Sequence, residues 1–325
     1  VGNLTGSELK DALDPIIDAD QWMRTFAMAT LTGSGDTYGR VWEHNFRYYV
    51  RPSDQKVIVL QWDLDSAFGL GASASILPTR NNIRKLFRIP QYRRLFDGHV
   101  EDIVNSSFNT AYSTTWANHL GSVSGNSFSS YNAYVRTRGN FALGTLPSNT
   151  VFAITTNGGD NFSEADSAID LEGDGWIDVF TIEVNGIPTT VNWTDANSWM
   201  ITIPICTGAN PPTLTAFNYH GEEVGSDSIS VTNTSAVYLA NISNTIISEL
   251  HYHPAAPSQV EIDAGFNDAD LFEFVELTNI GATNIDLTNA AFTDGVTFTF
   301  PAGTEFESGN QLIVVSNQAA FEFRY

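Results

Sequence analysis

The segment 57–69 carries the strongest structural and chemical signal of this chain: Val57-Ile58-Val59-Leu60-Gln61-Trp62-Asp63-Leu64-Asp65-Ser66-Ala67-Phe68-Gly69. Its first four residues are an unbroken apolar run, which is typical of a short strand buried on both faces. Two aspartates follow, and residues two apart in an extended backbone point to the same face. Their carboxylates can therefore flank one or two metal ions. The segment predicts a buried strand that ends in a carboxylate pair.

Two further polar residue types precede this strand. Asp36 lies in a glycine-rich segment, and Asn45 follows nine residues later, directly after His44. Phosphoryl transfer needs a carboxylate near the acceptor hydroxyl and hard oxygen ligands that hold Mg²⁺ on the phosphates. Asp36, Asn45 and Asp63 supply these types in that order. Because Asp and Asn are also common turn and cap residues, a purely structural role is the alternative.

A family resemblance favours the chemical role. The runs Ile17-Asp18-Ala19-Asp20-Gln21-Trp22, Asp36-Thr37-Tyr38, His44-Asn45 and Trp62 to Gly69 resemble the spore-coat protein H (CotH) kinase family over roughly residues 10–140. The resemblance implies an atypical Ser/Thr protein kinase that uses ATP with Mg²⁺ or Mn²⁺ and phosphorylates a secreted or surface protein.

The resemblance also implies residue roles. Asp36 would be the catalytic base, and Asn45, Asp63 and Asp65 would be metal ligands. Which of the two strand aspartates is the primary ligand stays open. The sequence departs from the family at Gln61, where a proline is usual, and it contains no upstream lobe with a phosphate-binding lysine. We therefore expect a fragment of a longer protein, truncated within the kinase-like region.

Helical patterns flank this segment. Apolar residues recur at helical spacing from Leu9 to Leu31 and from Asn82 to Leu120, where Pro90 predicts a helix start. Basic residues cluster around these predicted helix starts, and a solvated helix face is the expected role for them. The cluster consists of Arg80, Arg84, Lys85, Arg88, Arg93 and Arg94.

The pattern changes near residue 144 to short strands separated by turn residues, which favours β-sandwiches. We expect a kinase-like α+β domain over 1–143, an Ig-like sandwich over 148–235, and a third domain over 245–325. Residues 247–254, 273–279 and 298–304 of the third domain resemble a lamin-tail domain, here expected to be truncated at its C-terminus. The predicted fold class is thus a kinase-like C-lobe followed by two all-β sandwiches.

Two metal patterns occur in these acidic domains. Asp170, Asp174 and Asp178 occupy positions 1, 5 and 9 of a calcium-loop pattern, but position 12 is Thr181 instead of glutamate. Calcium is therefore a minor alternative to a β-turn. His251 and His253 share a strand face, but two ligands make no closed zinc site, and a structural role is expected.

Charge is distributed unevenly. Residues 139–325 contain one basic residue, Arg324, against twenty-four acidic ones. Binding of nucleic acid by phosphate neutralisation is therefore excluded for this half, and the acidic surface suits an extracellular or cell-surface location. No apolar run is long enough to span a membrane, and the single Cys206 excludes an internal disulfide. The alternative function is a non-catalytic surface, adhesion or matrix protein whose kinase-like region is degenerate.

Overall fold

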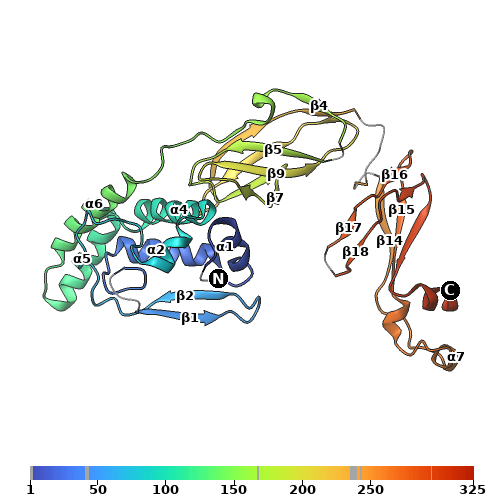
Figure 1. The fold of residues 1–325 in the computed structure, drawn as a ribbon, viewed down its shortest axis with the longest axis horizontal. Coiled ribbons are helices and arrows are strands. Elements are labelled where there is room, and N and C mark those ends of the chain that lie inside the picture. Colours follow the sequence, from blue (N-terminus) through green and yellow to red (C-terminus); the bar gives the residue numbers. More distant parts are fainter. Residues whose placement is uncertain (1–2, 41–43, 167, 235–239, 242–243, 294) are drawn as a thin grey trace. The chain divides into compact units, whose positions relative to one another are not determined.

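A computed structural model describes residues 3–40, 44–166, 168–234, 240–241, 244–293 and 295–325 (Figure 1). Contacts divide the chain into two compact units. The first comprises residues 1–160, 170–202 and 212–229, and the second comprises residues 161–169, 203–211 and 230–325. Residues 1 and 235, which bound two of the predicted domains, lie outside the described residues.

The N-terminal part of the first unit is mainly helical. Its helices are α1 (Gly6–Leu13), α2 (Ala19–Leu31), α3 (Asn81–Leu86), α4 (Pro90–Ser106), α5 (Thr110–Ser124) and α6 (Ser129–Leu143). Pro90 begins α4 as predicted. The helical stretch predicted from Leu9 to Leu31 is interrupted between α1 and α2, because Pro15 has no N–H to donate and clashes with a preceding turn. Ile17 leaves the helical pattern and forms a parallel bridge with Val57.

Helices α2 and α4 pack side by side and form the centre of this region (Figure 1). Met23 and Phe26 of α2 and Phe96 and Val100 of α4 are buried in one apolar cluster. The cluster also contains Leu86 of α3. A hairpin of β1 (Phe46–Val50) and β2 (Val57–Gln61) lies against α2.

The strand predicted from the apolar run is present, but its predicted burial on both faces is wrong. In the antiparallel register Phe46 faces Gln61 and Val50 faces Val57. Val59 is fully buried, whereas Leu60 is 48% exposed. A two-stranded hairpin has one face on helix α2, and no described segment covers the side chain of Leu60. The apolar run therefore predicted more burial of β2 than the structure shows.

Two four-stranded sheets complete the first unit. One has the order β3 (Ala153–Ile154), β5 (Ala168–Asp174), β9 (Ser198–Pro204) and β8 (Asn192–Trp193). The other has the order β12 (Glu223–Ser228), β11 (Thr213–Phe217), β6 (Thr181–Val184) and β7 (Ile187–Thr189). A short 3₁₀ helix spans Thr156–Gly159. Alternate residues are buried along β5 and β9, as in strands with one face in a core.

The second unit is almost entirely β-structure. One sheet joins β10 (Gly208–Asn210), β13 (Val231–Asn233) and β4 (Phe162–Glu164), and another joins β14 (Thr245–His251), β15 (Phe274–Asn279) and β20 (Gln311–Val315). Two strand pairs are β16 (Ile285–Asp286) with β19 (Glu305–Phe306) and β17 (Ala291–Phe292) with β18 (Phe298–Thr299). Short helices are α7 (Gln259–Asp263), the 3₁₀ helix Ala269–Phe272 and α8 (Gln318–Arg324). The predicted order of an α+β region followed by β-sandwich structure is confirmed.

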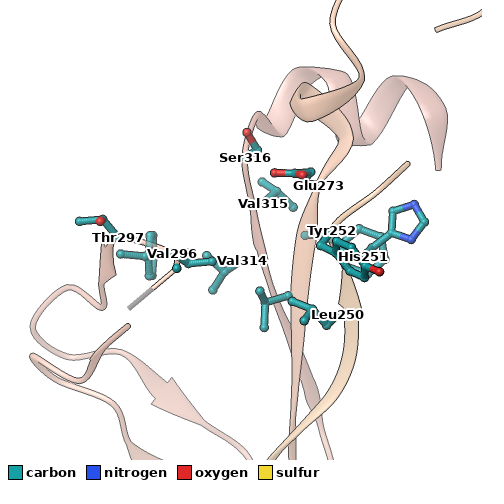
Figure 2. A pocket seen from close by; sticks show the side chains of 13 residues that line it. Leu250, His251, Tyr252, Glu273, Val296, Thr297, Val314, Val315 and Ser316 are labelled. Atoms are coloured by element: carbon teal, nitrogen blue, oxygen red, sulfur yellow. The ribbon is translucent and has the colours of Figure 1, made fainter. Parts of the chain in front are cut away.

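The core of this unit covers only part of the β14–β15–β20 sheet. Leu277 and Val314 are buried against Phe300 and Phe306. Leu250 of β14 pairs with the buried Val275, yet it is 57% exposed. A cavity of about 720 Å³ opens there, and Figure 2 shows Leu250 and Val314 on its strand side with Val296 opposite.

A partly buried ion pair between Arg324 and Glu261 stabilises the second unit in a pH-dependent way. Arg324 donates to both carboxylate oxygens of Glu261 at 2.7 and 3.0 Å, and its guanidinium lies 3.3 Å from the centre of the Phe272 ring. The hydrogen bonds from Arg324, followed by the backbone N–H of Ser258, lower the pKa of Glu261 from 4.5 to about 2. Because the folded-state pKa is lowered, the contribution is complete above pH 4.5 and is lost as the pH falls toward 2.

We expect Glu261→Gln to lower the melting temperature of this unit at pH 7 and to have little effect at pH 2. Thermal unfolding followed at both pH values checks the prediction. Glu305→Gln is the matched control, because Glu305 is exposed. An equal effect of Glu261→Gln at both pH values would contradict the role of its charge.

No helix among the described residues combines the length and the apolar character needed to cross a membrane.

Candidate active site

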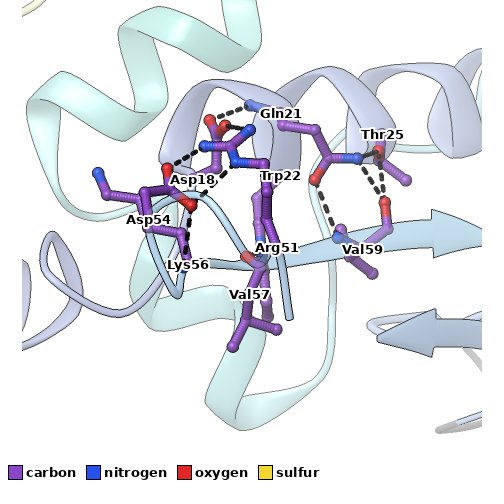
Figure 3. Close-up of polar contacts among 9 residues, drawn as sticks. All are labelled: Asp18, Gln21, Trp22, Thr25, Arg51, Asp54, Lys56, Val57 and Val59. Carbon is purple, nitrogen blue, oxygen red and sulfur yellow. Dashed lines mark hydrogen bonds and ion pairs between the residues drawn. The ribbon is translucent and has the colours of Figure 1, made fainter. Parts of the chain in front are cut away.

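Side chains of α2 fix the hairpin that carries the predicted metal ligands (Figure 3). The Gln21 amide accepts from the Val59 N–H at 2.9 Å and donates to the Val59 carbonyl at 2.5 Å. Thr25 donates to the same carbonyl at 3.2 Å, and the Trp22 indole donates to the Val57 carbonyl at 2.8 Å. The amide of Gln21 thus satisfies backbone groups of β2 as a neighbouring strand would.

The turn of the hairpin is also tied to α2. Arg51 binds Asp18, the N-cap of α2, at 2.9 Å and binds Asp54 at 2.5 Å (Figure 3). The hydrogen bond from Arg51 lowers the pKa of Asp54 to about 2, so Asp54 is ionised at neutral pH. The turn of the hairpin and strand β2 as far as Val59 therefore have defined positions on the helix.

Asp36, His44 and Asn45 come together at the open end of the hairpin. His44 Nε2 lies 2.9 Å from Asp36 Oδ1. Asn45 Nδ2 donates to the Asp36 carbonyl at 2.8 Å and to Asp36 Oδ2 at 3.2 Å. The carbonyl of Asn45 accepts from the Trp62 N–H at 2.9 Å. The cluster brings the predicted base and one predicted ligand into contact, and it places Asn45 beside the residue that precedes Asp63.

The backbone at this open end is unusual. Asn45 has a φ of 64° and Asp63 has a φ of 53°, which is the left-handed region that few residues other than glycine enter. Asp and Asn tolerate this region best, at a modest cost in free energy. Both residues therefore leave the strand geometry at the point where the two strands separate. This redirects their side chains relative to the pleat of the hairpin, a feature that no sequence pattern indicated.

Hydrogen bonds to other segments hold the loops that carry these residues in place. Ser34 and Ser66 share a hydrogen bond of 3.0 Å, and the Phe68 N–H donates to the Thr32 carbonyl at 2.7 Å. Arg40 is buried and donates to backbone carbonyls of residues 75–77 at 2.8 to 2.9 Å. Burial lowers the pKa of Arg40 to about 10, which leaves it charged at neutral pH. Sequence analysis did not find this anchor for the Asp36 loop.

The ligand set at this end is open and incomplete. Asp63 and Asp65 are both exposed. Within the part of the chain that the structure describes, no three His, Cys, Asp or Glu side chains gather closely enough to hold a metal ion. A cation here would take Asp63 and the Asn45 amide oxygen, with further ligands from water and phosphate. Mg²⁺ commonly binds in this way, through one or two carboxylates and substrate phosphates.

Two of the three residues of the calcium-loop pattern lie in a strand, and Asp178 lies in the turn that follows it. Asp170 and Asp174 belong to strand β5, where Asp170 accepts from Thr202 at 2.5 Å and Asp174 accepts from Ser198 at 3.1 Å. Burial raises the pKa of Asp178, which disfavours its charged form. A calcium site needs its oxygens to converge on one point from a curved loop, and an extended strand spreads them apart. His251 stacks on Phe274 with ring centres 5.0 Å apart, as expected for a structural residue.

The basic cluster is only partly a solvated helix face. Arg84 and Arg88 are exposed, as predicted. Arg94 is only 3% exposed, so the prediction is wrong for this residue. Its guanidinium donates to four backbone carbonyls, those of Gly175, Trp176, Val179 and Ala196. The burial of Arg94 depends on residues more than eighty positions away, which no local pattern reveals.

Comparison with known proteins confirms both resemblances. Residues 1–134 match the family model described as CotH kinase protein, and residues 239–323 match the Lamin Tail Domain model. The first match supports a kinase-like fold for the region that contains Asp36, Asn45 and Asp63. The second places a lamin-tail domain at the β14–β15–β20 sheet.

Two solved structures show weak likeness. CopC from Methylosinus trichosporium OB3b matches with 11% identity and a TM-score of 0.19, over 27% of this chain and 99% of its own length. SGBP-B of the Bacteroides ovatus mixed-linkage glucan utilization locus matches with 12% identity and a TM-score of 0.19, over 51% of this chain and 44% of its own length. At such TM-scores neither likeness bears on fold or function. No curated protein matches the chain.

Proposed function

We propose that the N-terminal region is the catalytic part of an extracellular protein kinase that transfers phosphate from ATP with Mg²⁺ or Mn²⁺. The observation that carries the proposal is the open end of the hairpin, where Asn45 and Asp63 both have left-handed backbones and Asp36 contacts Asn45. In protein kinases an Asp accepts the proton of the substrate hydroxyl, and an Asn and a second Asp hold the metal ions. Asp36, Asn45 and Asp63 have these types in the same order along the chain.

The geometry supports different roles for the side chains of Asn45 and Asp63. The Asn45 NH₂ group is used on Asp36, which leaves the amide oxygen of Asn45 as its ligating atom. Asp63 is exposed, so its carboxylate can reach both a hydrated cation and a phosphate. The lamin-tail and central strands contain no basic residue other than Arg324, which favours a spacer or binding role for them outside the cell.

We expect Asp63→Asn to weaken Mn²⁺ binding by about tenfold or more, since a metal ligand loses its charge. Titration of Mn²⁺ followed by electron paramagnetic resonance measures the affinity. Asp65→Asn is the matched control, because it removes the same charge two residues away and should change the affinity far less.

Equal Mn²⁺ affinity for the wild type and Asp63→Asn would remove Asp63 from the metal site. The alternative function is that of a non-catalytic surface or matrix protein with a degenerate kinase-like region. It would be supported if the wild-type chain also bound no Mn²⁺ and the natural gene product transferred no phosphate.

A further inference from the structure

An apolar groove lies directly beside the candidate active site. It has a volume of about 590 Å³ and runs between the segment after β2 and the helices α5 and α6. Its lining includes Leu64 and Phe68 of the segment after β2, Tyr112 and Trp116 of α5, and Tyr131 of α6. Phe68 packs against Tyr131 with ring centres 4.9 Å apart, so the wall nearest the active site is well defined.

Helix α5 presents an uncovered stripe to this groove. None of its residues is buried. Tyr112, Trp116 and Leu120 lie at successive four-residue intervals and are 49%, 51% and 49% exposed. Residues at this spacing share one helix face. The helix contains no Asp, Glu, Lys or Arg. An exposed contiguous apolar face of this kind marks a binding surface more often than a free one.

The groove is connected to the residues of the proposed function. Asp65 lines it and is the one charged residue among the described residues of its lining. Thr32 also lines it and precedes Asp36 by four residues. The hydrogen bond between Ser34 and Ser66 joins the Asp36 loop to the groove segment. The groove segment and the Asp36 loop are therefore joined directly through Ser66 and Ser34.

We propose that this groove binds the protein substrate through one large apolar side chain, and that Asp65 pairs with a Lys or Arg next to that side chain. The inference rests on the proposed function, because it assigns the substrate of the same site. It separates the two aspartates: Asp63 serves the cation, and Asp65 serves the substrate. A single carboxylate at the edge of an apolar groove is complementary to a cationic residue beside an apolar anchor.

The chemistry of the groove favours a peptide over a membrane surface. Helices that lie on membranes have Lys and Arg on their polar face, and α5 has neither. The groove is concave and large enough for one or two side chains, as peptide-anchoring pockets are. Aromatic residues are frequent in its lining, and such residues anchor protein partners effectively.

The proposal is tested with an arrayed peptide library, in which the central serine is fixed and all other positions are varied. Binding of labelled wild-type chain is measured without nucleotide or metal. We expect enrichment of Phe, Leu or Trp at one position, enrichment of Lys or Arg beside it, and depletion of Asp and Glu. Trp116→Ala should weaken the best peptide by about tenfold and remove only the apolar preference. Asp65→Asn should remove only the basic preference.

Val123→Ala is the matched control, because Val123 lies on the same helix, is 75% exposed and does not line the groove. Asp63→Asn should retain both preferences, which separates failure of this proposal from failure of the metal site. Absence of any apolar preference in the wild type, or its persistence in Trp116→Ala, would overturn the proposal. So would a dimer in sedimentation velocity, or flotation with anionic vesicles, that Trp116→Ala abolishes.

Discussion

Replacing Asp36 by asparagine is expected to lower phosphate transfer from ATP by about 10²- to 10⁴-fold, the range for loss of a positioned general base. The substitution keeps the shape of the side chain but removes the proton acceptor. Contacts with His44 and Asn45 remain possible, since an amide oxygen still accepts a hydrogen bond. Incorporation of labelled phosphate by the natural gene product with Mg²⁺ or Mn²⁺ measures the rate.

The Asp36→Asn variant should bind Mn²⁺ as the wild type does, because the base acts on the substrate hydroxyl and not on the cation. His44→Gln is the matched control: glutamine can still donate to Asp36, so a small loss of rate is expected. An undiminished rate in Asp36→Asn together with an inactive Asp63→Asn would place the base elsewhere. Equal, large losses in His44→Gln and Asp36→Asn would show that the contact between His44 and Asp36, and not the carboxylate alone, is required.

Much of the architecture follows from local sequence signals. Pro90 marks the start of α4, because its missing N–H costs nothing in the first turn of a helix. The apolar run at 57–60 forms β2, and it lies within the region that matches the CotH kinase model. The turn residues that divide the acidic half into short segments predicted strands, which the structure contains. These signals are local, so one sequence is sufficient to detect them.

The geometry of the candidate site required the three-dimensional structure. The sequence placed Asp36, Asn45 and Asp63 in order along the chain, but only the structure shows that Asp36 and Asn45 are in contact. The left-handed backbone at Asp63 depends on the end of the β1–β2 ladder, which the sequence does not define. The role of Asp65 was also undecided, because the shared face expected for the two aspartates presumed an extended strand, whereas β2 ends at Gln61 and Asp63 has a left-handed backbone.

Buried arginines were the largest class of residues that sequence reasoning missed. Arg40, Arg94 and Arg138 are 7%, 3% and 0% exposed. Arginine is rarely buried, and it is normally expected on a surface. Arg138 donates to the carbonyls of Thr30, Ala72 and Ala74, all far away in the sequence. Such carbonyls become available only where the chain turns, so burial of a guanidinium is decided by tertiary structure.

Arg94 allows a direct test of how much a buried arginine contributes to stability. We expect Arg94→Met to lower the free energy of unfolding by about 3 kcal/mol or more, because it leaves buried carbonyls without donors. The shortest of the four bonds are those to Trp176 at 2.5 Å and Ala196 at 2.7 Å. The guanidinium also lies 3.2 Å from the centre of the Trp193 ring. Methionine fills similar volume but satisfies none of these groups.

Urea unfolding measures the free energy, and amide hydrogen exchange over residues 175–197 locates the loss. Arg88→Met is the matched control, because Arg88 belongs to the same basic cluster but is exposed, and it should change stability little. Burial lowers the pKa of Arg94 to about 10, so the wild type is charged throughout the neutral range. Arg94→Lys keeps that charge but not the planar fork of donors. If Arg94→Lys were as stable as the wild type, charge alone would hold these carbonyls, and the geometry of the guanidinium would not matter.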